Sequence, residues 1–250
     1  MRIITKIDYK NGHVIKGRRY EGFKKVGPFN DIVSQYYHDG ACEFIFYDCV
    51  AALFGRPKLH RDLALACSNI FVPVTVGGGI RTYDQAANFF QSGADRVAVN
   101  SKLFDDDYLI ERIADSYGSQ SIVAMLEVKK IGTKWLLFTE LGREPIGLSL
   151  AEGFEICLKR GVGEICLNAI DFDGLLTGFP TELCALIPPK FPVPIILSGG
   201  FGGANQMQEL CDSGYEWLSG FALAAAFHQN RIRLADVKSL IKPEFSNNDL

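Results

Sequence analysis

The feature of this chain that most constrains its fold is an alternation of short β-rich runs with amphipathic helical runs, which occurs eight times. A strand followed by a helix, repeated in this way, is typical of parallel βαβ units. Eight units in 250 residues predict an α/β protein with a closed (β/α)8 TIM barrel, and an open doubly wound sheet is the alternative. The predicted strands are residues 3–8, 43–48, 72–76, 95–100, 121–128, 163–168, 193–197 and 216–221. The predicted helices are residues 30–40, 60–69, 82–93, 105–118, 148–161, 181–188, 205–214 and 235–242.

The two halves of the chain resemble each other at a nearly constant spacing. Asp8 of KIDYK and Glu127 of LEVKK are 119 residues apart, and the glycine pairs that begin at residues 77 and 199 are 122 apart. The Ser-Gly pairs that begin at residues 92 and 213 are 121 apart. Three matches in the same order indicate a barrel with a two-fold half-barrel repeat. Because no linker-like stretch separates the halves, we expect one barrel domain over residues 1–250.

The charge balance argues against nucleic acids and anionic membranes as partners. The chain has 26 Lys and Arg against 29 Asp and Glu, a net charge of −3. Without a basic excess, we expect no binding to nucleic acid or to an anionic membrane. No apolar run approaches the ~20 residues of a membrane span. Lys6 and Asp8 interrupt the first apolar run, which disfavours a secretory signal.

The cysteines indicate a reducing compartment. There are seven, an odd number, and no two are spaced C-x-x-C. In a chain of this size we interpret them as reduced and mostly buried thiols of a cytoplasmic protein. The four histidines show no metal-ligand spacing, so we expect no metal. The chain also lacks a G-x-S-x-G motif, so nucleophilic hydrolysis has no support.

Two glycine turns are candidate anion sites. Glycines 77–79 follow the third predicted strand and glycines 199–200 follow the seventh, with residues 100–101 and 224–228 beside them. Glycine lets backbone N–H groups approach a phosphate, and the start of a helix favours an anion. We therefore expect two phosphate sites on opposite sides of one barrel mouth. The alternative is that these glycines serve only tight turns with positive φ.

Two carboxylates end equivalent strands of the two halves. Asp8 and Glu127 both fall at the carboxyl end of a strand, where barrels place their catalytic groups. Opposed carboxylates divide general-acid and general-base duties when their environments separate their pKa values. The alternative is that each carboxylate caps a loop or pairs with a lysine.

Charged residues also mark the loop after the first strand and the opposite pole of the barrel. The loop, residues 10–29, is rich in lysine, arginine and glycine, and it either closes over an anionic substrate or is a solvated surface loop. Alternation along the first strand places Arg2 and Lys6 on the same face as Asp8. Arg2 is expected to form a ring of ion pairs with three charged residues that lie near the starts of other strands. Such a ring either plugs the barrel floor or controls a passage through it. Those three residues are Glu43, Arg96 and Glu164.

Taken together, several stretches resemble the HisF family, the cyclase subunit of imidazole glycerol phosphate synthase. The resemblance runs over essentially the whole chain and implies a (β/α)8 barrel of histidine biosynthesis that needs no cofactor. In that family, ammonia from a separate glutaminase subunit passes through the barrel to its mouth. There it reacts with the bisphosphorylated substrate PRFAR to give imidazole glycerol phosphate and AICAR. The matching stretches are KIDYKNGHVIKG, EFIFYDCVA, VPVTVGGGIR, SGADRVAVNS, GVGEICLNAIDFDGLLTG, VPIILSGGFG and ALAAAFH.

The resemblance also implies roles for individual residues. The catalytic acids fall on Asp8 and Glu127, and a loop lysine falls on Lys16. The glutaminase is expected at the N-terminal barrel face, where a charged ammonia gate falls on Arg2, Glu43, Arg96 and Glu164. One phosphate-binding end falls on Gly78, Gly79, Asn100 and Ser101. The other phosphate-binding end falls on Asp173, Gly174, Gly200, Ala224 and Ala225.

Some positions depart from the family pattern. Glu127 replaces an aspartate, Ala225 replaces a serine, and Lys6 and Met125 replace smaller inward residues. A buried Lys6 needs a partner, and Asp8 and Glu127 are the nearest candidates. Two alternatives to the cyclase therefore remain open. One is a paralogue that channels ammonia to another acceptor, such as a sugar amidotransferase of surface-polysaccharide synthesis, and the other is a non-catalytic activator of a glutaminase.

Overall fold

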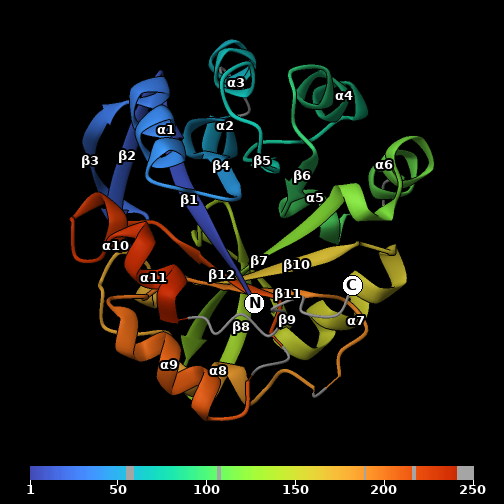
Figure 1. The fold of residues 1–250 in the computed structure, drawn as a ribbon. Coiled ribbons are helices and arrows are strands. Elements are labelled where there is room, and N and C mark those ends of the chain that lie inside the picture. Colours follow the sequence, from blue (N-terminus) through green and yellow to red (C-terminus); the bar gives the residue numbers. More distant parts are fainter. Residues whose placement is uncertain (55–58, 106–107, 189, 216–217, 241–250) are drawn as a thin grey trace, which may run out of the picture.

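Eight parallel strands form a closed barrel in the computed structural model, which describes residues 1–54, 59–105, 108–188, 190–215 and 218–240 (Figure 1). The last barrel strand pairs with the first, with Arg2 opposite Gly220, and this pairing closes the sheet. The predicted (β/α)8 barrel is therefore confirmed. The barrel strands are β1 (Arg2–Lys10), β4 (Phe44–Asp48), β5 (Val74–Gly77), β6 (Arg96–Val99), β7 (Ile122–Ile131), β10 (Glu164–Ala169), β11 (Ile195–Ser198) and β12 (Gly220–Leu223).

Helices surround the barrel on the outside (Figure 1). None of them, within the described ranges, is long and apolar enough to cross a membrane. They are α1 (Phe29–His38), α2 (Cys49–Phe54), α3 (Leu59–Cys67), α4 (Tyr83–Gln91), α5 (Ser101–Phe104), α6 (Leu109–Tyr117), α7 (Leu150–Arg160), α8 (Thr181–Cys184), α9 (Ala204–Asp212), α10 (Ala225–His228) and α11 (Leu234–Leu240), with short 3-10 turns η1 (Ser119–Ser121) and η2 (Ile170–Phe172).

Alternation along each strand divides the core into two parts. In β1, Ile3 and Ile7 face outward and join the large apolar layer between sheet and helices. Ile4 faces inward and joins a smaller cluster that fills the barrel. Lys6 and Asp8 follow on the same inward face and are fully buried. The strand pattern therefore brings charged side chains into the barrel interior.

A β-hairpin follows each strand that carries a candidate catalytic acid. After β1, the predicted loop 10–29 is an ordered hairpin of β2 (His13–Arg18) and β3 (Glu21–Pro28). After β7, a second hairpin of β8 (Lys134–Thr139) and β9 (Glu144–Ser149) had no counterpart among the predicted elements. The two hairpins add four antiparallel strands to the eight of the barrel sheet.

The tips of the two hairpins are equivalent in the half-barrel repeat. Arg19 and Tyr20 have φ of 54° and 56°, and Glu140 and Leu141, each 121 positions later, have φ of 53° and 59°. Left-handed conformations are costly for residues other than glycine and persist only where the surroundings hold them. The surroundings are the barrel mouth, because the side chains of Tyr20 and Leu141 are both buried in the inner cluster.

Some predicted boundaries differ from the structure. The last strand was predicted at 216–221 but begins at Gly220, where pairing with Arg2 closes the barrel. Residues 216–217 of that prediction lie outside the described residues, as do 106–107 and 241–242 of two predicted helices. An additional helix, α2, directly follows β4 and precedes the predicted helix at 60–69.

Candidate active site

Asp8 lies at the centre of a buried charge network at the carboxyl end of β1. Its Oδ2 accepts a hydrogen bond of 2.7 Å from Lys16 Nζ, and its Oδ1 lies 3.9 Å from Lys6 Nζ. Burial alone would raise the pKa of Asp8, but the ammonium groups of Lys16 and Lys6 outweigh it and hold that pKa below its usual value. Asp8 is therefore a carboxylate at neutral pH.

Glu127 occupies the equivalent place in the other half of the barrel and has the opposite electrostatics. Its Oε2 accepts from the Gly142 backbone N–H at 2.9 Å, and its Oε1 accepts from the Tyr47 hydroxyl at 3.3 Å. Burial raises the pKa of Glu127 to about 7, and these hydrogen bonds and Lys6 lower it only in part. The two acids thus differ in protonation near neutral pH, which is the arrangement that divides base and acid roles.

Lys16 ties the first hairpin to the barrel mouth. Its Nζ donates to Asp8 Oδ2 and to Asp173 Oδ1, both at 2.7 Å. Burial lowers the pKa of Lys16, but the carboxylates of Asp173 and Asp8 raise it more, so it remains charged. The backbone N–H of Arg19 also donates to the Asp173 carbonyl at 2.8 Å. The hairpin therefore lies closed over the acids.

Lys6 finds its closest partner on the tip of that hairpin. Its Nζ donates to the Tyr20 hydroxyl at 2.6 Å, and Asn168 Nδ2 donates to the same oxygen at 3.0 Å. The sequence suggested Asp8 or Glu127 as the partner of Lys6, and Asp8 is present only at 3.9 Å, the same distance as Asp173. Tyr20 thus gives Lys6 its closest hydrogen bond, while Asp8 and Asp173 supply the opposite charge, so the expected Asp8 is one of its ion-pair partners.

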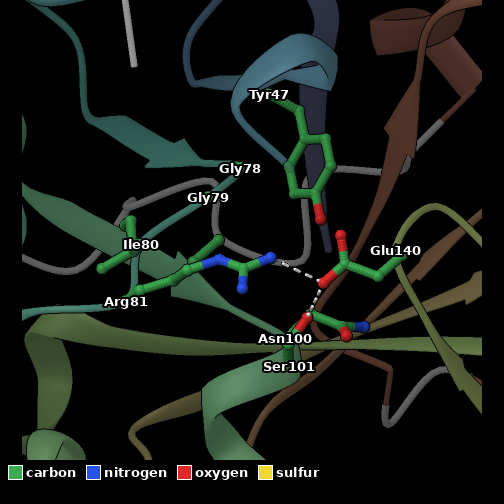
Figure 2. Close-up of a pocket in the computed structure, with 9 residues that line it drawn as sticks. Tyr47, Gly78, Gly79, Ile80, Arg81, Asn100, Ser101 and Glu140 are labelled. Atoms are coloured by element: carbon green, nitrogen blue, oxygen red, sulfur yellow. Dashed lines mark hydrogen bonds and ion pairs between the residues drawn. The ribbon is translucent and has the colours of Figure 1, made fainter. Parts of the chain in front are cut away.

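The first glycine turn opens onto a small cavity on the side of the barrel mouth where Glu127 lies. It is lined by Gly78, Gly79, Asn100 and Ser101, the four residues expected at one phosphate end. Figure 2 shows the Glu140 carboxylate pointing into this cavity, toward Arg81 and Ser101. The cavity has a volume of about 20 Å³.

The second glycine turn opens onto a separate small cavity. This cavity is lined by all the residues expected at the other phosphate end and also by Lys16 of the first hairpin. Its volume is about 10 Å³. Ser198 lines it as well. The expected residues are Lys16, Asp173, Gly174, Gly200, Ala224 and Ala225.

The glycines of both turns are required by close backbone approach. Gly78 and Gly200 both have φ of 97°, and a Cβ on either would lie 2.2 Å from a carbonyl oxygen, that of Asp48 or that of Gly178. The expected tight turns with positive φ are therefore present, and each turn also lines a cavity at the mouth.

The opposite pole of the barrel carries a closed ring of ion pairs. Arg96 donates to Glu43 Oε1 and Glu164 Oε2, both at 2.7 Å, while Arg2 pairs with Glu43 at 3.1 Å and also contacts Glu164. The two arginines and two glutamates alternate, so each charge has two opposite neighbours. This ring spans the floor beneath the inner apolar cluster.

A hollow lies next to the floor, at the starts of β5 and β6. Its volume is about 370 Å³, and its lining includes Pro73, Asp95 and Phe71, whose side chain is 83% exposed. Sequence reasoning did not single out Phe71.

Several residues of the mouth were also missed from sequence. They come from the hairpins or from neighbouring strand ends, and the half-barrel spacing would have pointed to the two hairpin tips. They are Tyr20, Tyr47, Arg81, Glu140, Gly142 and Asn168. Among the described residues, no group of three or more His, Cys, Asp or Glu is placed to hold a metal ion.

Comparisons with known proteins agree with the barrel fold and identify a family. The model of the "Histidine biosynthesis protein" family matches residues 2–233. Imidazole glycerol phosphate synthase subunit HisF of Dehalococcoides mccartyi is 33% identical over 241 residues, which cover 96% of this chain and 94% of that protein. The subunit of the same name from Legionella pneumophila is 38% identical over 203 residues, 81% of this chain and 96% of that protein. The one from Pelodictyon phaeoclathratiforme is 35% identical over 237 residues, 94% and 93% of the two chains.

Proposed function

This chain belongs to the histidine biosynthesis protein family, and from that premise we propose that it is the cyclase subunit of an imidazole glycerol phosphate synthase. It uses ammonia to convert PRFAR into imidazole glycerol phosphate and AICAR. The observation that carries the proposal is the pair of buried acids with separated pKa values, which lies at a mouth flanked by two glycine-turn cavities. The relatives described above all bear the name of this synthase subunit, which favours the cyclase over a sugar-pathway paralogue.

The acid pair supplies the proton transfers that the reaction needs. A nitrogen that attacks as neutral ammonia gains positive charge and must lose a proton, while the amine that leaves must gain one. Asp8, which remains ionised, accepts the proton as general base. Glu127, whose pKa is about 7, donates one as general acid.

The two cavities hold the two phosphates of the substrate. Gly78, Gly79, Asn100 and Ser101 take one end, and the residues of the second cavity take the other, with Lys16 beside them. Because the cavities are too small for phosphate as they stand, the hairpins open to admit the substrate and close again to exclude water.

Ammonia enters from the floor, where a glutaminase subunit docks. The ring of Arg2, Glu43, Arg96 and Glu164 lies at the N-terminal end of the strands and acts as the gate. Phe71 and its hollow, at the same end, support this face as the docking surface. A Phe71→Ser variant is expected to weaken the glutaminase complex at least tenfold, measured by calorimetry, without loss of ammonium-driven turnover.

We place the protein in the cytoplasm as one barrel domain that acts without cofactor, nucleic acid or membrane. None of the cysteines whose side chains the structure describes forms a disulfide, which supports a reducing compartment. The closed sheet draws strands from both halves of the chain, which supports one domain.

The decisive experiment is turnover of PRFAR with ammonium salts. We expect release of AICAR by the wild type, and a loss of at least about 100-fold in Asp8→Asn and in Glu127→Gln. Lys24→Met, which alters an exposed side chain of the first hairpin, is the control. Stimulation of a glutaminase without turnover of PRFAR would instead support a conduit or an activator and would overturn the cyclase.

A further inference from the structure

The cavity at the first glycine turn is already lined by a carboxylate of the protein, that of Glu140. Glu140 Oε1 accepts a hydrogen bond of 2.9 Å from Arg81 Nη2 and one of 3.1 Å from Ser101 Oγ (Figure 2). A guanidinium and a hydroxyl are the donors that a phosphate oxygen prefers. The carboxylate therefore uses the side-chain donors that an incoming phosphate would use.

The hairpin tip keeps this carboxylate in place. Glu140 has a left-handed φ of 53°, which is costly for a side chain with a Cβ. The next residue, Leu141, is 2% exposed in the inner cluster, and the following N–H, of Gly142, donates to Glu127. The tip thus has an anchor after its strained residue, and the partly exposed side chain of Glu140 lines the cavity.

The space that remains does not admit a phosphate. The cavity at the first turn has a volume of about 20 Å³, which is on the order of one water molecule. The charge of Arg81 is also neutralised by its ion pair with Glu140. A phosphate that approached Gly78 and Gly79 would therefore meet both a filled site and a like charge.

We propose that Glu140 is a specificity-determining residue of the first glycine turn, a resident anion that a substrate phosphate must displace from Arg81 and Ser101. The substrate class, a bisphosphate, rests on the proposed function. Because the same tip holds Glu127 through Gly142, displacement of Glu140 moves the turn that positions the general acid. The cavity at the second turn is lined by a different carboxylate, Asp173, which pairs with Lys16, so its affinity for phosphate should not depend on Glu140.

Inorganic phosphate tests this proposal directly. In crystals soaked in phosphate, we expect the anion at the first turn of Glu140→Gln and not at the first turn of the wild type, because a neutral amide does not compete for Arg81 as the carboxylate does. In calorimetric titrations, Glu140→Gln should bind phosphate at the first turn about ten- to 100-fold more tightly than the wild type, because a like charge has been removed. With PRFAR, the same variant should lower KM.

Two further variants separate charge from shape. Glu140→Asp retains the negative charge and should still exclude phosphate, while Glu144→Gln makes the same change at an exposed position of the same hairpin and should behave as the wild type. The proposal is overturned if phosphate binds at the first turn of the wild type while Glu140 stays on Arg81, or if Glu140→Gln leaves phosphate affinity unchanged. If PRFAR is not turned over but phosphate binding changes as expected, the proposed function fails and this assignment stands.

Discussion

Lys6 and Tyr20 join the barrel interior to the tip of the first hairpin, through a 2.6 Å hydrogen bond from the lysine Nζ to the phenol oxygen. Both side chains are buried. Since Tyr20 sits on a left-handed turn, this bond holds a strained tip that would otherwise relax. The closed mouth therefore depends on a lysine from the barrel wall.

Removal of this bond should loosen the hairpin. In Tyr20→Phe and Lys6→Met we expect amide hydrogen exchange within residues 14–27 to speed up about tenfold, the effect of one lost buried hydrogen bond to a charged group. Lys24→Met, at an exposed position of the same hairpin, is the matched control. Unchanged exchange in Tyr20→Phe, which keeps the fold and loses only the hydroxyl, would show that the tip is held by other contacts.

The pH dependence of turnover should follow Glu127. A general acid must be protonated, so the rate per concentration of neutral ammonia should be level below the pKa of about 7 and fall about tenfold per pH unit above it. Asp8 remains ionised over this range because its pKa is lowered. Tyr47→Phe removes a hydrogen bond that favours the ionised form of Glu127, so the fall should begin at higher pH. A profile that does not move in this variant would count against Glu127 as the acid.

The free energy of unfolding should also depend on pH through the titration of Glu127. The carboxyl of Glu127 titrates near 4.5 in the unfolded chain and near 7 in the folded one, so the folded state binds the proton more tightly. Stability therefore decreases as pH rises from about 4.5 to about 7, by roughly 3 kcal/mol at most. Glu127→Gln should abolish this decrease, as measured by urea unfolding at a series of pH values.

Disruption of the floor ring should affect turnover differently according to whether the ammonia comes from glutamine or from ammonium salts. Arg96→Met leaves Glu43 and Glu164 with Arg2 alone, and we expect a cost of roughly 2 kcal/mol in stability because the pairs are only partly buried. Glutamine-driven turnover should fall more than ammonium-driven turnover. Arg233→Met, which removes an exposed pair with Asp236, is the control and should alter neither. Equal losses with both ammonia sources would argue against a gate.

Substitution of the second turn should affect folding and phosphate binding together. In Gly200→Ala the new Cβ would lie 2.2 Å from the Gly178 carbonyl at a φ of 97°, and we expect a loss of at least about 2 kcal/mol. That corresponds to a fall in Tm of about 4–8 °C. Gly203→Ala, three positions later, places its Cβ in open space and should change Tm little. Similar Tm values for the two variants would be inconsistent with the close approach described here.

The sequence predicted the barrel but not its closed mouth. Strand and helix periodicity identified the eight units because each element buries one face against the next. The spacing between the halves located Asp8, Glu127 and both glycine turns, which depend on local strand ends. The tips at Tyr20 and Glu140 were not predicted, because two left-handed residues other than glycine have no local signal and are held by side-chain contacts with other parts of the barrel mouth.

The filled centre of the mouth has a practical consequence for inhibitor discovery. Tyr20 and Leu141 occupy the volume over the acids, so a compound library screened against the ligand-free form meets almost no concavity there. A compound can bind there only after the hairpins have opened, and it must then displace the side chains that fill the mouth. Slow-onset inhibition, rather than fast equilibrium binding, is the kinetic signature that such compounds would share.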